Sequence, residues 1–405
     1  TTQKNEKPEP IDVEMVDTET GSARSIHPYP KIVASAGDAI AEHKYRFNWD
    51  AGLSLSPHDP ETVYFGGNVI FRSRDRGNSW QVISDDLTNN DKSKQASSGG
   101  TVYQDNTAAE FHNTILYVTE SPLEQGVIWA GTDDGNLHVT RNDGETWSNV
   151  NDNVGGLPKF AWISKIHPSE HDAGTAFISI DHHRSDDYRP YAFMTTDYGQ
   201  SWKSLSEGLP QDDYVKVIRQ DPRNPNLLYV GMEHGIFASL DQGETWASIA
   251  NNLPPVSVRD LRVHPREGDL IVGTHGRGAW ILDDVRPLQN WADAQEAVAH
   301  LFPVRDATRW HMHNRLENQG TRRYSAANPE YGAYVNVYIA EAPEEPITVT
   351  IRSSDGEIVR VLDEIEAEAG VNRIVWDLRH DAATELDNPP ESGWNTDPVH
   401  VFATP

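Results

Sequence analysis

The densest group of reactive side chains lies at positions 182–191, where the sequence reads HHRSDDYRPY. Paired carboxylates can serve as acid and base, and imidazole together with carboxylate can bind a metal ion. The same segment can also be a structural insertion held by Arg–Asp pairing and a Tyr hydroxyl, so both interpretations stay open. Its candidate ligand-binding residues are His182, His183, Arg184, Asp186 and Asp187.

No diagnostic catalytic motif accompanies this segment. The sequence has no HExxH zinc motif and no cysteine, and nothing in it supports a Ser-His-Asp nucleophile. Glycoside hydrolysis needs two carboxylates ~5–10 Å apart, but any choice of a pair among 62 acidic residues would be arbitrary. Catalytic residues and metal ligands are therefore not assigned, and no cofactor is predicted. Structural Ca²⁺ in acidic loops is an open alternative.

The elements that must position these side chains are repeats. A pattern of the form Ser/Thr-x-Asp-x-Gly-x-x-Trp occurs four times. Its hydroxyl and carboxylate can stiffen a turn, its glycine can take a positive φ, and its tryptophan can bury a large ring. We therefore interpret these positions as structural. The copies are Ser73, Asp75, Gly77 and Trp80; Thr140, Asn142, Gly144 and Trp147; Thr195, Asp197, Gly199 and Trp202; and Ser239, Asp241, Gly243 and Trp246.

A second pattern precedes each of these Asp boxes: a strand, a turn that contains proline, a short apolar strand and a glycine turn. Together with the box and the strand after it, this predicts a four-stranded propeller blade. Five such repeats are visible, and the fifth has no box. The strands expected to open the blades cover residues 51–56, 114–119, 161–166, 215–220 and 258–263. The predicted fold class is therefore all-β, with propeller blades.

These boxes, with the segments RFNWDAGLSLSPHDP, HHRSDDYRPY, DPRNPNLLYVG and GTHGRGAWILDD, resemble a bacterial family of VPS10/sortilin-like, BNR-repeat propellers. The family is often labelled glycosyl hydrolase. The resemblance covers roughly residues 45–285. It implies a longer chain with further blades, so we expect five blades to be part of a larger ring that a second fragment completes.

Equivalent turns of adjacent blades should gather on one face of the ring. We therefore expect one candidate binding patch made of Asp134, His182, Glu233, His234, His275 and Arg277. In the segment RFNWD, Arg46 and Asn48 are expected to face the channel, while Phe47 and Trp49 pack between blades. Ordinary packing and loop support is the alternative interpretation for all of these residues.

The composition narrows the classes of partner. The chain has 34 Lys and Arg against 62 Asp and Glu, a formal net charge of −28. This charge opposes binding to nucleic acid. No run of ~18 apolar residues predicts a membrane span. The absence of cysteine excludes disulfides and is compatible with a bacterial secreted or periplasmic protein.

The flanks of the repeats predict further parts. We expect a linker or inter-blade segment at 1–44, with a strand at 11–15; blades at 45–285; a connector at 286–330 with a helix over 291–300; and a β-sandwich of Ig-like type at 331–405, which can be incomplete. The function expected is a secreted binding or scaffold protein that holds a polypeptide or glycan on its blade loops. The alternative is a glycoside hydrolase or lyase that acts on an extracellular polysaccharide.

Overall fold

The computed structural model describes residues 13–29, 43–96, 111–309 and 329–381. The chain divides into two compact units, which are treated separately below. The first comprises Thr1–Pro265 and Asp269–Asp283, and the second comprises Arg266–Gly268 and Asp284–Pro405.

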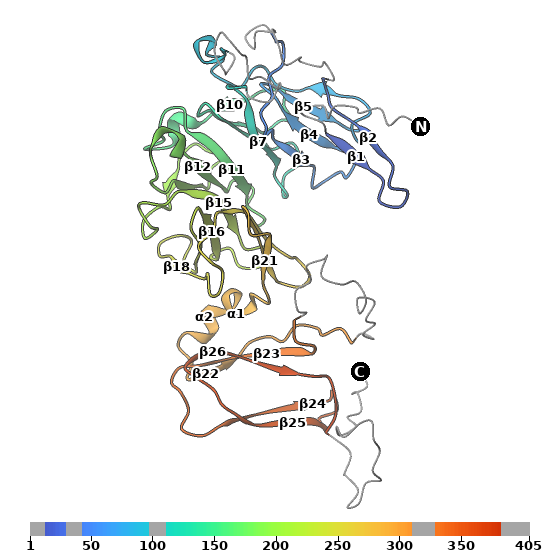
Figure 1. Cartoon of the computed structure of the whole chain (residues 1–405), viewed down its shortest axis with the longest axis vertical. Coiled ribbons are helices and arrows are strands. Elements are labelled where there is room, and N and C mark those ends of the chain that lie inside the picture. Colours follow the sequence, from blue (N-terminus) through green and yellow to red (C-terminus); the bar gives the residue numbers. More distant parts are fainter. Residues whose placement is uncertain (1–12, 30–42, 97–110, 310–328, 382–405) are drawn as a thin grey trace, which may run out of the picture. The chain divides into compact units, whose positions relative to one another are not determined.

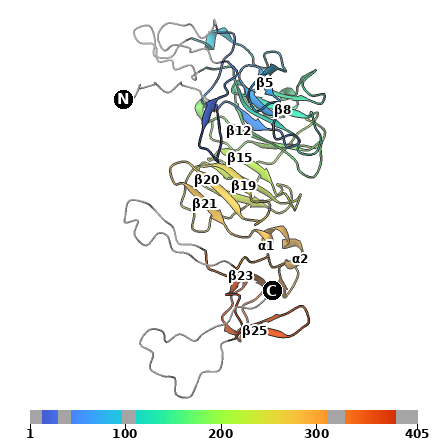
Figure 2. The same ribbon diagram turned by 90° about the vertical axis from the view of Figure 1, so that its right-hand side faces the viewer.

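The first unit is a series of antiparallel sheets, one per repeat (Figures 1 and 2). Four sheets have four strands and the fifth has three, each in chain order. This confirms the prediction of an all-β propeller fold. The strands are, in blade 1, β3 (Leu53–Leu55), β4 (Val63–Gly66), β5 (Ile70–Ser73) and β6 (Gln81–Val82); in blade 2, β7 (Ile115–Glu120), β8 (Ile128–Thr132), β9 (Leu137–Thr140) and β10 (Ser148–Asn149); in blade 3, β11 (Trp162–Pro168), β12 (Ala176–Asp181), β13 (Ala192–Thr195) and β14 (Lys203–Ser204); in blade 4, β15 (Val215–Gln220), β16 (Leu228–Met232), β17 (Ile236–Ser239) and β18 (Ala247–Ser248); and in blade 5, β19 (Val258–Val263), β20 (Leu270–Thr274) and β21 (Ala279–Leu282).

The first strand of each blade contacts the first strand of the next, from β3 to β19. Blades pack face to face through apolar side chains, and a residue without a Cβ lets two blades approach closely. At Gly131 an added Cβ would lie 2.4 Å from the Ile163 side chain of the next blade, and at Gly231 it would lie 2.5 Å from Val258. In blade 3 the equivalent position is Ser179, whose hydroxyl donates to the Lys216 carbonyl of blade 4 at 3.1 Å.

The four Asp-box turns share one hydrogen-bond pattern. In the first, the Gly77 amide donates to Ser73 Oγ at 2.7 Å and the Ser79 amide donates to Asp75 Oδ1 at 2.8 Å. Gly77 has a φ of 82°, which favours glycine. The box tryptophans of blades 2 and 4 donate from Nε1 to a carbonyl of the preceding blade: Trp147 to Ile83 and Trp246 to Leu205, both at 2.9 Å. The boxes of blades 2 and 4 thereby join two blades, whereas Trp202 in blade 3 donates to the Gly199 carbonyl of its own turn at 3.2 Å.

A short hairpin precedes blade 1. It pairs β1 (Glu14–Val16) with β2 (Ala23–Ser25), close to the strand expected at 11–15. The Trp80 indole of blade 1 donates to the Ile26 carbonyl at 2.8 Å. The hairpin thus contacts the first Asp box.

Among its described residues, the second unit holds two short helices and two sheets. One sheet has the order β22-β23-β26, and the other pairs β24 with β25. The helix expected over 291–300 ends early, because Ala299 and Leu301 pair with β23 instead. The elements are α1 (Arg286–Gln289), α2 (Trp291–Ala294), β22 (Ala299–Leu301), β23 (Ala333–Ile339), β24 (Ile347–Arg352), β25 (Ile358–Ile365) and β26 (Gly370–Trp376).

Candidate functional site

The side chains that converge best lie where the first strand of a blade begins and its second strand ends. In blades 3 and 4, this end carries a group that we call the rim cluster. Its buried centre is Lys216, which is 4% exposed and follows the first residue of β15. The members of the rim cluster are Asp181, His183, Tyr214, Lys216 and Glu233.

Lys216 connects the two carboxylates of the cluster. Its Nζ lies 2.9 Å from Asp181 Oδ2 and 3.8 Å from Glu233 Oε2. Asp181 also contacts His183 Nδ1. The His183 ring stacks on Tyr214 with centroids 4.6 Å apart. Lys216 Nζ lies 4.1 Å from the centre of the same tyrosine ring, which places the ammonium in a cation–π contact with Tyr214.

These contacts keep both carboxyl groups ionised. Burial raises the pKa of Asp181, but the Lys216 ammonium and the His183 hydrogen bond outweigh it, and the pKa is lowered overall. Burial likewise raises the pKa of Glu233, while hydrogen bonds from Ser257 and Tyr214 lower it by more. Burial lowers the pKa of Lys216, which the Asp181 carboxylate opposes. Neither carboxyl is therefore tuned toward a general acid, which needs a raised pKa.

The cluster continues into blade 5. Tyr214 and Ser257 donate to Glu233 Oε2 at 2.9 and 2.7 Å. The His275 amide donates to the Ser257 carbonyl at 2.8 Å. The positive charge of Arg259 contributes to the lowered pKa of Glu233. Three consecutive blades therefore share one polar network.

The exposed side chains of this rim differ in charge from the buried ones. Arg184 lies over the Trp162 ring at 3.6 Å, and its side chain is 46% exposed. His234 contacts Asp213, which is buried, and its own side chain is 68% exposed. Asp181 and Asp213 are buried, whereas Asp186 and Asp212 are exposed. The exposed cationic, imidazole and aromatic side chains are Arg184, Tyr188, Arg189, His234, Arg259, His275 and Arg277.

Asp187, which belongs to the same loop, is engaged locally. It accepts two hydrogen bonds from Arg189, at 2.9 and 2.6 Å, and one from the Tyr191 hydroxyl at 2.8 Å. The Arg189 hydrogen bonds are the main reason that its pKa is lowered. His182 is half-buried directly before the short 3₁₀ turn His183–Ser185.

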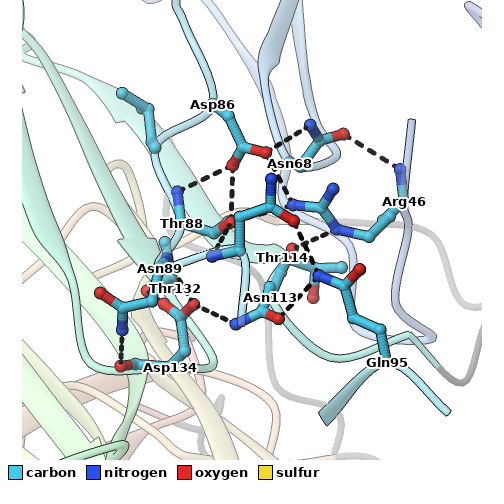
Figure 3. A network of polar contacts seen from close by, with 12 residues as sticks. Arg46, Asn68, Asp86, Thr88, Asn89, Gln95, Asn113, Thr114, Thr132 and Asp134 are labelled. Atoms are coloured by element: carbon cyan, nitrogen blue, oxygen red, sulfur yellow. Dashed lines mark hydrogen bonds and ion pairs between the residues drawn. The ribbon is translucent and has the colours of Figure 1, made fainter. Parts of the chain in front are cut away.

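Two other candidates lie in a separate network in blades 1 and 2 (Figure 3). Arg46 was expected to face the channel, but it is only 2% exposed. It donates to Asp86 and to the Asn113 carbonyl at 2.8 and 3.2 Å. Asp134 accepts from the Asn89 amide at 2.7 Å and from Asn113. Burial raises the pKa of Asp134. This network braces the two blades internally.

Its neighbouring residues depart from the expectation for RFNWD. Phe47 is buried, as predicted, and stacks with Phe65 at 5.6 Å. The prediction is wrong for Trp49, which is 62% exposed, and for Asn48, which is buried. Asn48 Nδ2 donates to the Phe111 carbonyl at 3.3 Å, so Arg46 and Asn48 turn inward, whereas Asp50 is exposed.

The structure thus brings His183 and Glu233 together, links His275 to them through Ser257, and separates Arg46 and Asp134 from them. Sequence reasoning missed Asp181, Tyr214, Lys216 and Arg259. One signal was available: Lys216 interrupts the apolar strand VKVI, and a charge in a buried strand needs a partner. Within residues 13–29, 43–96, 111–309 and 329–381, no three His, Asp or Glu side chains are placed to hold a metal ion.

No family model matches the sequence, and no curated protein matches it. Solved structures do match. A GH74 xyloglucanase from Xanthomonas campestris is 18% identical over 58% of this chain and 36% of that chain, with a TM-score of 0.43. A GH74 enzyme from Niastella koreensis is 16% identical over 67% and 49%, with a TM-score of 0.33. YCF48 bound to D1 peptide is 13% identical over 60% and 80%, with a TM-score of 0.29.

The chain spans less than half the length of these GH74 structures. At such identities and TM-scores, the likenesses bear on neither activity nor substrate. In the described part of the chain, no helix is long and apolar enough to cross a membrane.

Proposed function

We propose that the protein is a binding propeller that holds a carboxylate-bearing polymer, a polypeptide or a glycan, across the rim of blades 3 to 5. One observation carries this proposal. In a protein of net charge −28, this rim buries Asp181 and Asp213 and exposes Arg184, Arg259 and Arg277, although Asp186 and Asp212 are exposed as well. Arginine pairs well with carboxylates through its planar fork of donors, and partly desolvated pairs gain most.

The experiment is isothermal titration with polygalacturonate, poly-glutamate and neutral dextran at two salt concentrations. We expect the two anionic polymers to bind, more weakly at high salt, and dextran not to bind. Arg184→Ala and Arg259→Ala should each weaken binding by about tenfold, which corresponds to ~1.4 kcal/mol. Arg266→Ala is the matched control, because Arg266 is an exposed arginine in the turn at the other end of the β19–β20 pair. Equal losses in all three variants would contradict a rim site.

A glycoside hydrolase is the second candidate function. It is favoured by the proximity of Asp181 and Glu233, which contact the same ammonium and so fall below the ~9.5 Å upper limit of glycosidase carboxylate pairs. The lowered pKa of each group argues against it. Reducing ends released from polygalacturonate or xyloglucan, and abolished by Asp181→Asn or Glu233→Gln, would replace the binding proposal with this one.

The finer family assignment is part of the same proposal. The four Asp-box turns support a sortilin-like BNR propeller. The proposal includes a secreted or periplasmic location, and an Ig-like second unit, which its two antiparallel sheets support. Fractionation of the source cells with an antibody against the protein tests its location, and recovery in the cytosolic fraction would contradict it.

A further inference from the structure

The hairpin β1–β2 has the hydrogen-bond geometry of the outer half of a blade. In complete blades, the amide after the fourth strand donates to the carbonyl of the residue that starts the third strand: Ile83 to Ile70 at 3.0 Å, and Leu205 to Ala192 at 2.8 Å. The Ile26 amide donates to the Val13 carbonyl at 2.7 Å in the same way. Strands β1 and β2 therefore correspond to a third and a fourth strand.

Ile26 also occupies the place that a preceding blade fills elsewhere. A Cβ on the box glycine Gly77 would lie 2.5 Å from Ile26, whereas on Gly243 it would lie 2.9 Å from Leu205 of the preceding blade. Trp80 donates to the Ile26 carbonyl as Trp246 donates to Leu205. The hairpin is thus half of a blade that stands before blade 1. Among the described residues, its sheet has these two outer strands alone.

Among the described residues, no inner strand pair of the half-blade covers the inner face of blade 1. We call the place of Gly131 and Gly231 in the second strand of a blade the close-approach position. In each blade, one residue of the first strand faces the preceding blade. This residue pairs with the residue just before the close-approach position. These residues are at most 1% exposed in blades 2 to 5, but Leu53 in blade 1 is 54% exposed. The residues of blades 2 to 5 are Val118, Ile166, Ile218 and Leu261.

A cavity of about 870 Å³ lies beside this uncovered face. Val13 and Met15 from the hairpin line it, as do Leu53 and Leu55 from β3. The cavity includes the space between the outer half-blade and β3, where an inner strand pair belongs, and it also reaches Tyr117, His167 and Arg219 in the first strands of blades 2 to 4.

At the other end of the propeller unit, the face of blade 5 that would contact a following blade is also uncovered. Gly273 pairs with the first residue of the third strand, as Gly131 and Gly231 do. A Cβ on Gly273 would meet no atom closer than 3.5 Å, and that atom belongs to its own blade. On the same face Ile281 is 58% exposed, whereas its counterpart Val139 in blade 2 is 4% exposed. Blade 5 thus carries the close-approach glycine, and within the described part of the propeller unit no blade follows it.

We infer that a further propeller segment, outside residues 1–405, completes the ring. It starts with a whole blade that packs on Gly273 and Ile281, and it ends with an inner strand pair that joins β1 and covers Leu53. A second copy of this chain does not fit, because among its described residues the leading half-blade has no first strand to place on Gly273. This inference does not depend on the proposed ligand.

The test begins with the protein purified from its source under mild conditions. Peptide sequencing, native mass spectrometry and hydrogen exchange are compared with a recombinant chain of residues 1–405. We expect additional Asp-box sequence, on a separate or a joined polypeptide, and slower exchange by about tenfold or more at β1 and β3. A homodimer, or an assembly in which β1 and β3 exchange as fast as in the recombinant chain, would overturn the inference.

Two substitutions test the contacts themselves. Gly273→Val and Leu53→Glu should leave the melting temperature of the recombinant chain unchanged. In the complete assembly, they should abolish association with a separate segment, or lower the melting temperature of a joined one. Gly155→Val and Leu123→Glu are matched controls at open positions. If the controls and the test variants behave alike, the two end faces are not interfaces.

Discussion

The middle blades and the two ends of the propeller unit are built from the same repeat, but their residues are buried differently. All five residues of β16 in blade 4 are buried, whereas in the equivalent β20 only Leu270 and Val272 are. The sequences LLYVG and DLIVG are nearly alike. Burial of a blade therefore depends on its neighbours as much as on its own sequence, as in other repeat proteins.

The largest expected effect concerns Lys216 in blade 4 and Arg259 in blade 5, which occupy equivalent places in β15 and β19. Lys216→Met leaves the buried Asp181 carboxylate without its ammonium, so we expect a loss of about 3–5 kcal/mol of unfolding free energy. Arg259→Met removes an exposed charge and should change it by less than ~0.5 kcal/mol. Urea unfolding of both variants at neutral pH measures the difference. Similar losses would mean that the two blades are equally buried in solution.

The next largest expected effect is on the unfolding free energy when an apolar side chain is truncated at the same position in two different blades. Ile218 is fully buried between blades 3 and 4, while Leu53 is 54% exposed. Ile218→Ala should cost about 2–5 kcal/mol, through lost burial and the cavity left behind. Leu53→Ala should cost less than ~0.5 kcal/mol in the chain of residues 1–405. A costly Leu53→Ala in that chain would show that something within it already covers this face.

A smaller effect on stability is expected when Gly231 and Gly273, which occupy the same position in blades 4 and 5, are each replaced by valine. Gly231→Val forces a Cβ to 2.5 Å from Val258, so we expect a loss of about 1–3 kcal/mol from overpacking. Gly273→Val has room, and valine favours a strand, so stability should hold or rise slightly. Differential scanning calorimetry of the two variants gives the comparison. A loss at Gly273 as large as that at Gly231 would contradict an open end face.

The sequence predicts these blades well because their signals are local. Alternating strands bounded by proline turns place β15 and β19 at their observed bounds, residues 215–220 and 258–263. Likewise, the box residues bond within one turn. Lys216 and Asp181 are 35 positions apart and meet only when two blades pack, so no local signal joins them. The hairpin before blade 1 is recognised as half a blade from contacts that appear only in the folded chain, such as the hydrogen bond from Trp80 to the Ile26 carbonyl.

The smallest effect concerns the box turns, which should not depend on their place in the ring. Hydrogen bonds from Ser79 and Ser73 lower the pKa of Asp75 to about 2. A carboxyl whose pKa is depressed on folding adds stability above its unfolded value, ~3.9, and loses it as the pH falls toward the folded value. Asp75→Asn should therefore reduce the fall in the urea midpoint between pH 5 and pH 2.5. Asn142 shows that an amide fits the turn, because its Nδ2 donates to Thr146 Oγ1 at 2.9 Å. Asn142→Asp, the reverse change in blade 2, should steepen the same pH dependence by a similar amount. If the two substitutions shift the slope in the same direction, the box carboxylate is not the titrating group.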